Sequence, residues 1–319
     1  MNYDIFSRSK YRANDKSGDD VALVLPGVCF AVLDGATDVE GRDLNGVPYG
    51  RAASIVASQI LTEILLPYRN REKDAERLFA DLCMYYERAF EDYDLDQLPS
   101  TTVAMAIDCD TNWRFLSLGD SGIRINGARV LKHDKLIDSI STEVRVSIFK
   151  ILAEKFDDPD EHELMTRQAI FFGLAKARSQ GLLSEEVVET LIKETIENLK
   201  LSEIAQIVRD FLLLGIRHQH RFSNSKENAL CYDIVSSRKP VLGQWAEEIV
   251  PKHEVKTIEI FSDGYASYPE EVNIVALEKE FSKCDDIDFC RIDEFAAVKG
   301  STSSEFFDDR TLIVVDTSI

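Results

Sequence analysis

Two pairs of short apolar segments, each joined by only a few turn-forming residues, constrain the fold of this chain more than any other feature. "VALVL" at 21–25 is followed by "VCFAVLD" at 28–34 after the dipeptide "PG", which is a strong turn signal. "TTVAMAID" at 101–108 is followed by "WRFLSLGD" at 113–120 after the polar "CDTN". Parallel strands need a crossover of a dozen or more residues, so both pairs predict antiparallel hairpins.

Helices are predicted between these two hairpins. Apolar residues recur at roughly helical spacing in "GRAASIVASQILTEILLPY" (50–68), and a second helical pattern covers 75–90. Two further strand-like segments, 257–264 and 311–316, come late in the chain. Strands and helices in this order predict an α+β architecture, in which helices pack on the outer face of a sheet.

Helix-forming residues dominate a block that runs from about position 143 to 222. Ser184 and Ser202 each precede one or two acids, which predicts that both cap the N-terminus of a helix. The block has no cluster of residue types that carry catalysis, so we expect a helical subdomain inserted into the sheet domain. His218 and His220 lie near its end, accompanied by no acid or third histidine, which favours a surface loop or helix end over a metal site.

The chain is strongly acidic, which limits the partners that it can bind. Asp and Glu number 57 against 37 Lys and Arg, for a formal net charge of −20, and no basic patch is evident. This charge repels a nucleic-acid backbone. No segment approaches the ~18 consecutive apolar residues of a membrane span. We therefore expect neither nucleic acid nor a membrane as a partner.

The six cysteines are scattered without the C-x-x-C spacing of a zinc or redox site. Cys29 lies inside an apolar run, which is typical of a buried, reduced thiol. The opening "MNYDIFSRSKYRAND" lacks the apolar core of a signal peptide. Together these features predict a cytoplasmic protein.

Acidic residues stand at the ends of the predicted strands. An ionised group is costly inside a core, so such acids belong where a sheet meets solvent or a cleft. One Asp-Gly pair alone indicates an ordinary turn. Several acids at aligned strand ends, however, would converge and repel one another unless cations neutralise them or some stay protonated. The acids in question are Asp19, Asp20, Asp34, Asp120, Asp263, Asp308 and Asp309.

A set of oxygen ligands alone favours Mg²⁺ or Mn²⁺ over zinc. Two such ions close together, bridged by a carboxylate and a water, can convert that water into a hydroxide and bind the oxygens of a phosphoryl group. The acids therefore predict a metal centre and a reaction on a phosphate ester that needs no side-chain nucleophile.

Five segments occur in an informative order: "FAVLDGATD", "STTVAMAID", "WRFLSLGDSG", "IEIFSDGY" and "DDRTLIVV". In order and context they resemble the signature segments of the metal-dependent protein phosphatases, the type 2C serine/threonine phosphatases. The resemblance covers roughly 10–131 and 228–316 and leaves the helical block unexplained. It implies an α-β-β-α sandwich of two stacked antiparallel β-sheets flanked by helices. Residues 1–142 and 223–319 would then form the catalytic domain, and 143–222 a large helical insertion.

The resemblance assigns metal-binding roles to the strand-end acids. Asp34 matches the carboxylate that bridges two Mg²⁺ or Mn²⁺ ions, and Gly35 matches the residue whose backbone carbonyl binds one of them. Asp263 and Asp308 match the acids that complete the shell of the other ion, and with Asp34 they form the implied catalytic set. Asp120 matches an acid that, with the Asp263 position, forms a weaker third metal site in some members.

Several acids are candidates for the N-terminal metal ligand. Asp20, with or without Asp19, matches the acidic pair before the first strand, while Asp15 in "RAND" is a competing candidate. Arg12 corresponds to the phosphate-binding arginine of the family, with a longer spacing to Asp20 than is usual.

The chain departs from the family's pattern in its substrate-handling parts. Ala36 stands where some members have the histidine proposed as general acid, and "PSTT" lacks the usual glycine before the third strand. The helical block replaces or greatly enlarges the ordinary flap. We therefore expect 143–222 to form a lid or docking surface that restricts which phosphoproteins reach the metals and that offers a site for a partner protein.

These features lead to two classes of function. The first is a metal-dependent phosphatase that hydrolyses phosphoserine or phosphothreonine on proteins through a metal-bridging water. The alternative is a non-catalytic regulator or scaffold whose helical insertion binds a partner protein. Retention of several mutually repelling acids favours catalysis, since a scaffold does not need them. A phosphatase of another fold with a nucleophilic aspartate is disfavoured, because it needs Asp-x-Asp and here Asp38 comes four residues after Asp34.

Overall fold

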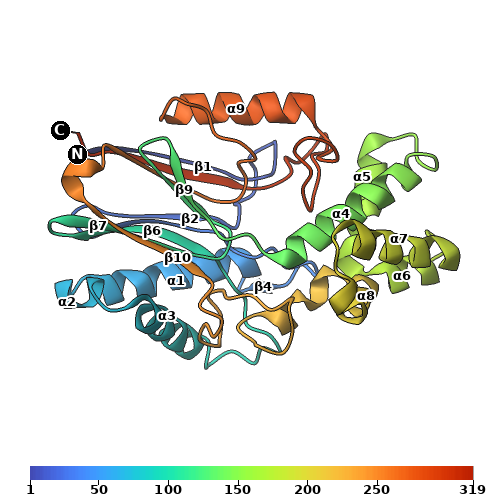
Figure 1. Cartoon of the computed structure of the whole chain (residues 1–319), viewed down its shortest axis with the longest axis horizontal. Helices are drawn as coiled ribbons and strands as arrows, with labels where there is room; N and C mark the ends of the chain where they lie inside the picture. Colours follow the sequence, from blue (N-terminus) through green and yellow to red (C-terminus); the bar gives the residue numbers. More distant parts are fainter. Residues whose placement is uncertain (319) are drawn as a thin grey trace.

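The computed structural model describes residues 1–318 and has the predicted α+β architecture. Two five-stranded antiparallel sheets are stacked on each other, and helices cover their outer faces (Figure 1). The fold is therefore an α-β-β-α sandwich with a large helical insertion, as expected. A separate two-stranded ribbon joins β4 (Asp43–Leu44) to β5 (Val47–Pro48).

Every neighbouring pair of strands in the two sheets is antiparallel. The first sheet has the order β1 (Asn2–Arg8), β12 (Arg310–Asp316), β11 (Thr257–Phe261), β8 (Gly122–Ile125) and β9 (Arg129–Leu131). The second sheet has the order β10 (Trp245–Pro251), β7 (Asn112–Leu118), β6 (Val103–Cys109), β3 (Cys29–Leu33) and β2 (Val21–Leu25). Both predicted hairpins, β2 with β3 and β6 with β7, are confirmed.

The sequence-based prediction missed the short ribbon strands β4 and β5 and, within the two five-stranded sheets, the four strands β1, β8, β9 and β10. β1 and β10 are edge strands, and most of their residues are exposed or half-exposed. Edge strands therefore lack the apolar runs that reveal central strands. β8 and β9 are short and lie at or near the other edge of the first sheet. A short helical turn, η3 (Lys252–Glu254), follows β10.

The core between the two sheets is built from alternate residues of facing strands. Phe30 and Val32 of β3 pack there with Ile260 of β11 and Ile313 of β12, and all four are fully buried. The intervening residues of β3, such as Leu33, join the core beneath the helices instead. Because both faces of β3 are covered, all five of its residues are apolar.

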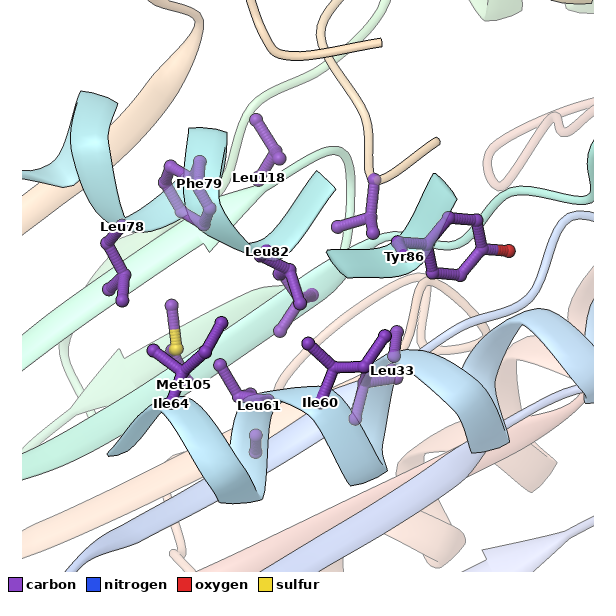
Figure 2. Packing of buried hydrophobic residues seen from close by; sticks show 14 of the residues in the cluster. Leu33, Ile60, Leu61, Ile64, Leu78, Phe79, Leu82, Tyr86, Met105 and Leu118 are labelled. Carbon is purple, nitrogen blue, oxygen red and sulfur yellow. The ribbon is translucent and has the colours of Figure 1, made fainter. Parts of the chain in front are cut away.

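Three helices cover the outer face of the second sheet, and one covers the first (Figure 1): α1 (Tyr49–Leu65), α2 (Tyr68–Arg71) and α3 (Ala75–Ala89), and opposite them α9 (Ile274–Ile287). Figure 2 shows Leu61 of α1 and Leu82 of α3 in one layer with Leu33 and Met105 of the sheet. Replacing one such buried leucine by alanine typically costs about 2–5 kcal/mol. This packing fixes where the C-terminal end of β3 lies.

The helical block has an apolar core of its own, which includes Val144, Leu191 and Val208. Its elements are α4 (Leu136–Leu152), α5 (Pro159–Phe172), α6 (Leu174–Ser179), α7 (Glu185–Asn198) and α8 (Ala205–Leu214), with the short turns η1 (Ser202–Ile204) and η2 (Ile216–Phe222). Within residues 1–318, no helix is both long enough and apolar enough to cross a membrane.

The boundaries of the block differ in two places from the sequence-based prediction. The run of helices begins at Leu136, before the predicted position 143, and Ile140 already lies on the buried face of α4. Ser184 caps α7 as predicted, since its side chain accepts a hydrogen bond from the Val187 amide. The cap predicted at Ser202 is wrong, because this residue lies inside η1 and no side chain caps that turn.

A buried ion-pair network attaches the helical block to the loop before β12. Arg145 of α4 and Glu163 of α5 are ion-paired, and both side chains are fully buried. Arg145 also donates to the backbone carbonyls of Arg291 and Ala297, while Glu163 accepts from the Gly300 amide at 2.7 Å. Because each charge is compensated, the network can hold the block to the loop without leaving a bare carboxylate in the interior.

Candidate metal centre

The strand pairing brings the predicted acids to one end of the sandwich. In an antiparallel pair, the end of one strand lies beside the start of its partner. Val21 of β2 pairs with Leu33 of β3, so the next residues outward, Asp20 and Asp34, are neighbours.

The first sheet repeats this arrangement with its own two acids. Phe261 at the end of β11 pairs with Leu312 near the start of β12. Asp263, just beyond β11, therefore lies beside Asp308, which comes just before β12. Since the two sheets are stacked, the two pairs of acids meet at the same end.

The electrostatic effects of the acids on one another show how close they are. Burial raises the pKa of Asp34 well above its usual range, and the charges of Asp20, Asp263 and Asp308 raise it further. Burial, followed by the charge of Asp308, raises the pKa of Asp263 to about 7. The fully ionised cluster is therefore unfavourable without added positive charge.

Asp20 has the environment most suited to a cation. The residue is 3% exposed, and neither of its carboxylate oxygens accepts a well-formed hydrogen bond from residues 1–318. Burial and the charge of Asp309 raise its pKa well above the usual range, and the Ser262 hydroxyl offsets this only in part. A buried carboxylate without a donor is costly, so this group requires a cation or a proton.

The structure separates the three N-terminal candidates. Asp20 belongs to the acidic cluster. Asp19 accepts a hydrogen bond from the Thr37 hydroxyl at 3.0 Å, and its Oδ2 lies 3.6 Å from the ammonium nitrogen of Lys10. Asp15 is exposed and lies outside the cleft at the cluster. Of the three acids, Asp20 is the one whose oxygens are left for an ion.

Asp309 orders the N-terminal segment, a role that the sequence did not reveal. Its carboxylate accepts hydrogen bonds from the backbone amides of Lys10 at 2.6 Å and Asp19 at 2.9 Å. Asp309 thereby holds the segment before β2 against the start of β12. No sequence pattern distinguishes it from Asp308, because its partners are backbone amides near the other end of the chain.

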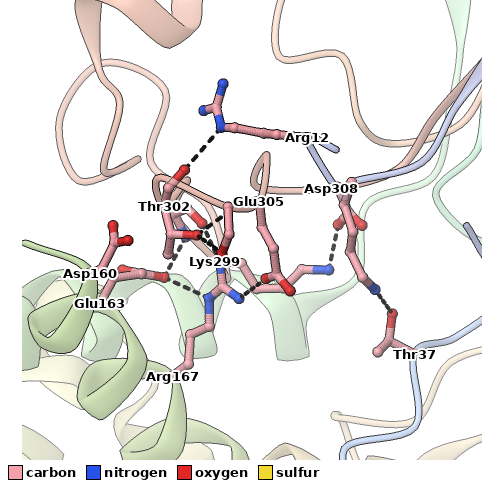
Figure 3. Close-up of polar contacts among 12 residues, drawn as sticks. Arg12, Thr37, Asp160, Glu163, Arg167, Lys299, Thr302, Glu305 and Asp308 are labelled. Carbon is pink, nitrogen blue, oxygen red and sulfur yellow. Dashed lines mark hydrogen bonds and ion pairs between the residues drawn. The ribbon is translucent and has the colours of Figure 1, made fainter. Parts of the chain in front are cut away.

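Lysines neutralise part of the cluster, and the sequence analysis missed them. Nζ of Lys299 lies 2.8 Å from Asp308, as Figure 3 shows, and Nζ of Lys135 lies 2.7 Å from Asp120. Burial alone would raise the pKa of Asp120, but the charge and hydrogen bond of Lys135, together with the charge of Lys132, outweigh it and lower that pKa. Lys299 belongs to the loop before β12, and Lys135 directly precedes α4 of the helical block. No sequence motif surrounds either lysine, so no pattern could have identified them.

An open cleft of ≈ 950 Å³ gives access to this end of the sandwich. Asp19 and Asp20 lie beneath its wall and do not line it. The helical block contributes to the wall through Glu143, Phe171 and Ile216. Five of the predicted metal ligands line the cleft: Asp34, Gly35, Asp120, Asp263 and Asp308.

The structure does not bring Arg12 to this cleft. Its guanidinium donates to the Thr302 carbonyl at 2.9 Å (Figure 3). It also donates to Asp285 of α9 at 3.1 Å and lies over the ring of Phe306. These contacts hold the loop before β12 against α9. The placement expected from the family's pattern is thus corrected, and the contacts of Arg12 do not support a phosphate-binding role.

The chemistry of the donor set fits Mg²⁺ or Mn²⁺. The candidates are carboxylate and backbone oxygens, which these cations prefer. The acids are not yet gathered around one point: among residues 1–318, no three His, Cys, Asp or Glu side chains converge closely enough to hold an ion. Mutual repulsion keeps carboxylates apart, and Asp120 and Asp308 are paired with lysines. His218 and His220 lie in η2, at the end of the block, as expected.

No protein-family model and no curated protein matches this chain. Among solved structures, it is similar to a bacterial serine phosphatase, with 12% identity over 100% of this chain and 98% of the other and a TM-score of 0.46. It is also similar to the serine/threonine phosphatase Stp1 from Staphylococcus aureus, with 12% identity, 99% and 94% coverage and a TM-score of 0.44. The Mycobacterium tuberculosis serine/threonine phosphatase PstP/Ppp gives 14% identity, 99% and 97% coverage and a TM-score of 0.44. Similarities at this level of identity and TM-score do not establish the chemistry of this chain, which is argued from its own residues. The fold assignment follows from its own sheet order and strand pairing.

Proposed function

We propose that this protein is a divalent-metal-dependent phosphatase that hydrolyses phosphoserine or phosphothreonine in proteins. The observation that supports this most is Asp20, a buried carboxylate that accepts no well-formed hydrogen bond from residues 1–318, close to Asp34 and Asp263 beside an open cleft. Buried carboxylates that serve only the fold are normally paired. A bare acid among other acids is typical of a site that cations complete.

In this proposal, oxygens of the chain hold two Mg²⁺ or Mn²⁺ ions. When bound, such ions lower the pKa of a bridging water, which becomes the nucleophile, and bind the oxygens of the phosphoryl group. Asp34, Asp20, Asp263, Asp308 and the Gly35 carbonyl would hold these two ions, and Asp120 with Asp263 would hold a weaker third ion.

Other residues of the cleft orient and attract the substrate. Lys135 and Lys299 place two positive charges on its wall, where they attract a phosphate in a chain of net charge −20. Ala36 also lines the cleft and has no ionisable group. The proton for the leaving alkoxide therefore comes from water and not from a side chain at that position.

The proposal also includes a division of the chain into a catalytic unit and a helical insertion. Residues 1–142 and 223–319 form the catalytic unit, and 143–222 form a lid or docking surface for phosphoproteins or a partner protein. The separate apolar core of the block and its contribution to the cleft wall support this division.

A non-catalytic regulator is the second candidate, and the lysine contacts favour it. Lys299 and Lys135 already neutralise Asp308 and Asp120 from within the chain. Internal counter-ions of this kind would stabilise an acidic cluster that no longer served catalysis. The helical block would then bind a partner protein, and the cleft would turn over no phosphate ester.

The experiment that separates the two candidates is Mn²⁺-dependent hydrolysis of p-nitrophenyl phosphate, with and without a chelator. Asp34→Asn should remove most of the turnover, because it removes the bridging charge while leaving the core intact. Asp4→Asn makes the same charge change on the exposed strand β1 and should leave turnover unchanged. No hydrolysis from neutral to mildly alkaline pH, in protein that binds Mn²⁺ by calorimetry, would favour the regulator.

A further inference from the structure

A second, smaller cavity of ≈ 160 Å³ adjoins the cleft at the acids. Both cavities share walls formed by Thr37 and Val39 after β3, by Ile216 and Gln219 of η2, and by Tyr232. Successive residues of an extended peptide advance by about 3.3 Å. A substrate chain that crosses these shared walls would therefore enter the second cavity within a few residues of the group held at the acids.

One wall of the second cavity comes from a segment that is unusually basic for this chain. The segment 211–226, which contributes η2 to its wall, contains three Arg or Lys residues and no Asp or Glu, although acids outnumber bases by 57 to 37 in the whole sequence. The cationic and imidazole side chains that line the cavity are Arg42, Arg217, His218 and His220.

Two acids also line the cavity, and both lie nearer to Arg42 than to Arg217 in their ion-pair contacts. Arg42 donates to Oδ1 of Asp38 at 2.6 and 3.1 Å, and its Nε lies 3.9 Å from Glu40. Arg217, in contrast, forms no ion pair with residues 1–318, and its Nε makes only a long 3.4 Å hydrogen bond to the Leu214 carbonyl. Arg217 therefore has an uncompensated charge beside the cavity.

The two histidines respond to the same positive surroundings. Burial and the charges of Arg221 and Arg217 lower the pKa of His218, and burial and the charge of Arg221 lower the pKa of His220. Glu40 opposes this effect on both rings but does not outweigh it. The part of this effect that comes from the arginine charges would also attract an anion, whereas burial disfavours a charge of either sign.

We propose that this cavity is a specificity subsite for an anionic side chain of the phosphoprotein substrate, a few residues away from the phosphorylated residue. Arg217 binds the anion, and the imidazole N–H of His218 adds a neutral donor, while the N–H of His220 is directed to the Arg217 carbonyl. The inference rests on the proposed function and extends it by naming a feature of the substrate sequence. Asp, Glu and a second phosphoserine share the required chemistry.

The test measures peptide binding to the whole protein in Mn²⁺. Each fluorescein-labelled peptide has a phosphonomethyl group in place of the phosphoserine ester, so that it cannot be hydrolysed. Glu is placed one to four residues before or after this group, with Gln at the same place in the matched peptide. Fluorescence anisotropy should show about three-fold tighter binding of the best Glu peptide, the size expected of a partly exposed ion pair. High salt should reduce the preference.

Two variants connect the preference to Arg217. Arg217→Gln should bring the ratio of Glu to Gln binding to about one, whereas Arg217→Lys should keep part of it. Lys193→Gln removes the same charge from an exposed position of α7, outside both cavities, and should keep the full preference. A peptide with a second phosphoserine at the best position identifies phosphate as the preferred anion if it binds more tightly than the Glu peptide.

Several results would overturn the subsite. These are equal binding of Glu and Gln peptides at every position, a preference that survives Arg217→Gln, and no measurable binding of any peptide. Failure of the subsite can be distinguished from failure of the proposed phosphatase function. Hydrolysis of phosphopeptides without a Glu preference would retain the phosphatase and remove the subsite. A Glu preference without hydrolysis would retain the subsite in a regulator.

Discussion

Two buried carboxylates of this protein have opposite surroundings. Glu163 in the helical block is fully buried and is held by Arg145, Arg167 and the Gly300 amide. Asp20 in the sandwich is 3% exposed, accepts no well-formed hydrogen bond from residues 1–318, and has only the Ser262 hydroxyl nearby as a weak donor. Burial is nearly the same in both cases, so the donors around a buried acid, more than its burial, separate an acid that serves the fold from one that a ligand must complete.

Breaking the compensated pair should have the largest effect on stability. Arg145→Ala would leave Glu163 buried without one of its two arginines, and loss of one member of a buried ion pair costs about 3–5 kcal/mol of unfolding free energy. Urea denaturation followed by circular dichroism measures the loss. Arg178→Ala removes the partner of the exposed Glu185 and should cost less than about 1 kcal/mol. Equal losses in the two variants would contradict the importance given to the buried network.

Added Mn²⁺ should stabilise the protein through the uncompensated acids. The unfolding free energy should rise by about 2.7 kcal/mol at a free Mn²⁺ concentration of ~100 times Kd, because the ions bind the folded state and relieve repulsion among the acids. Scanning calorimetry in Mn²⁺ and in EDTA measures the shift in Tm. Asp263→Asn and Asp308→Asn should reduce that shift, while Asp4→Asn should not. Identical melting of the wild type in both solutions would exclude the metal centre.

Asp20→Asn should stabilise the protein in EDTA by about 1–3 kcal/mol, because it removes a buried charge that lacks a donor. Glu163→Gln, the equivalent change at the compensated acid, should destabilise it. The gain at Asp20 should be larger at pH 8 than at pH 5. Its raised pKa means that the folded protein favours the protonated acid, so ionisation at higher pH weakens the wild type. Urea titrations at both pH values test this, and a loss of stability in Asp20→Asn would contradict it.

Lys299→Gln should have the smallest effect, a tightening of Mn²⁺ binding by a few fold. The ammonium group lies 2.8 Å from Asp308 and competes with an ion for that carboxylate. An exposed or partly exposed charge pair contributes up to about 1 kcal/mol, which corresponds to about five-fold in affinity. Isothermal titration calorimetry measures it, with Lys279→Gln on the exposed side of α9 as control. Weaker binding in Lys299→Gln would show that the lysine supports the site.

The central strands could be predicted from the sequence because their surroundings are uniform. β3 is buried on both faces and is apolar throughout, and a two-residue turn connects it to β2. β1 and β10 could not be predicted, since "NYDIFSR" and "WAEEIVP" place polar residues on the exposed face of an edge strand. An unbroken apolar run indicates a strand that is buried on both faces. An edge strand is largely exposed, so its sequence contains no such run.

The acids of the site could be predicted, but their partners could not. Asp34 and Asp263 stand directly after apolar runs, so local sequence shows that they lie at strand ends. Lys299 contacts Asp308 because of the path of a long loop. A loop has no sequence periodicity from which such a contact could be predicted. Arg12 was misplaced for a related reason, since its partner Asp285 lies 273 residues away along the chain. Contacts of this kind are set by tertiary packing alone.

The buried network between the helical block and the loop before β12 has an evolutionary consequence. An insertion that met its host only at its two ends could be lost or exchanged by recombination with little harm. In this protein, Arg145 of the block also provides the donors for the carbonyls of Arg291 and Ala297 in the loop. Descendants that lost the block would leave the Ala297 carbonyl without its guanidinium donor and the Arg291 carbonyl with only the Ala297 amide. Block and loop should therefore be inherited as one unit, and related chains that shorten one should show compensating change in the other.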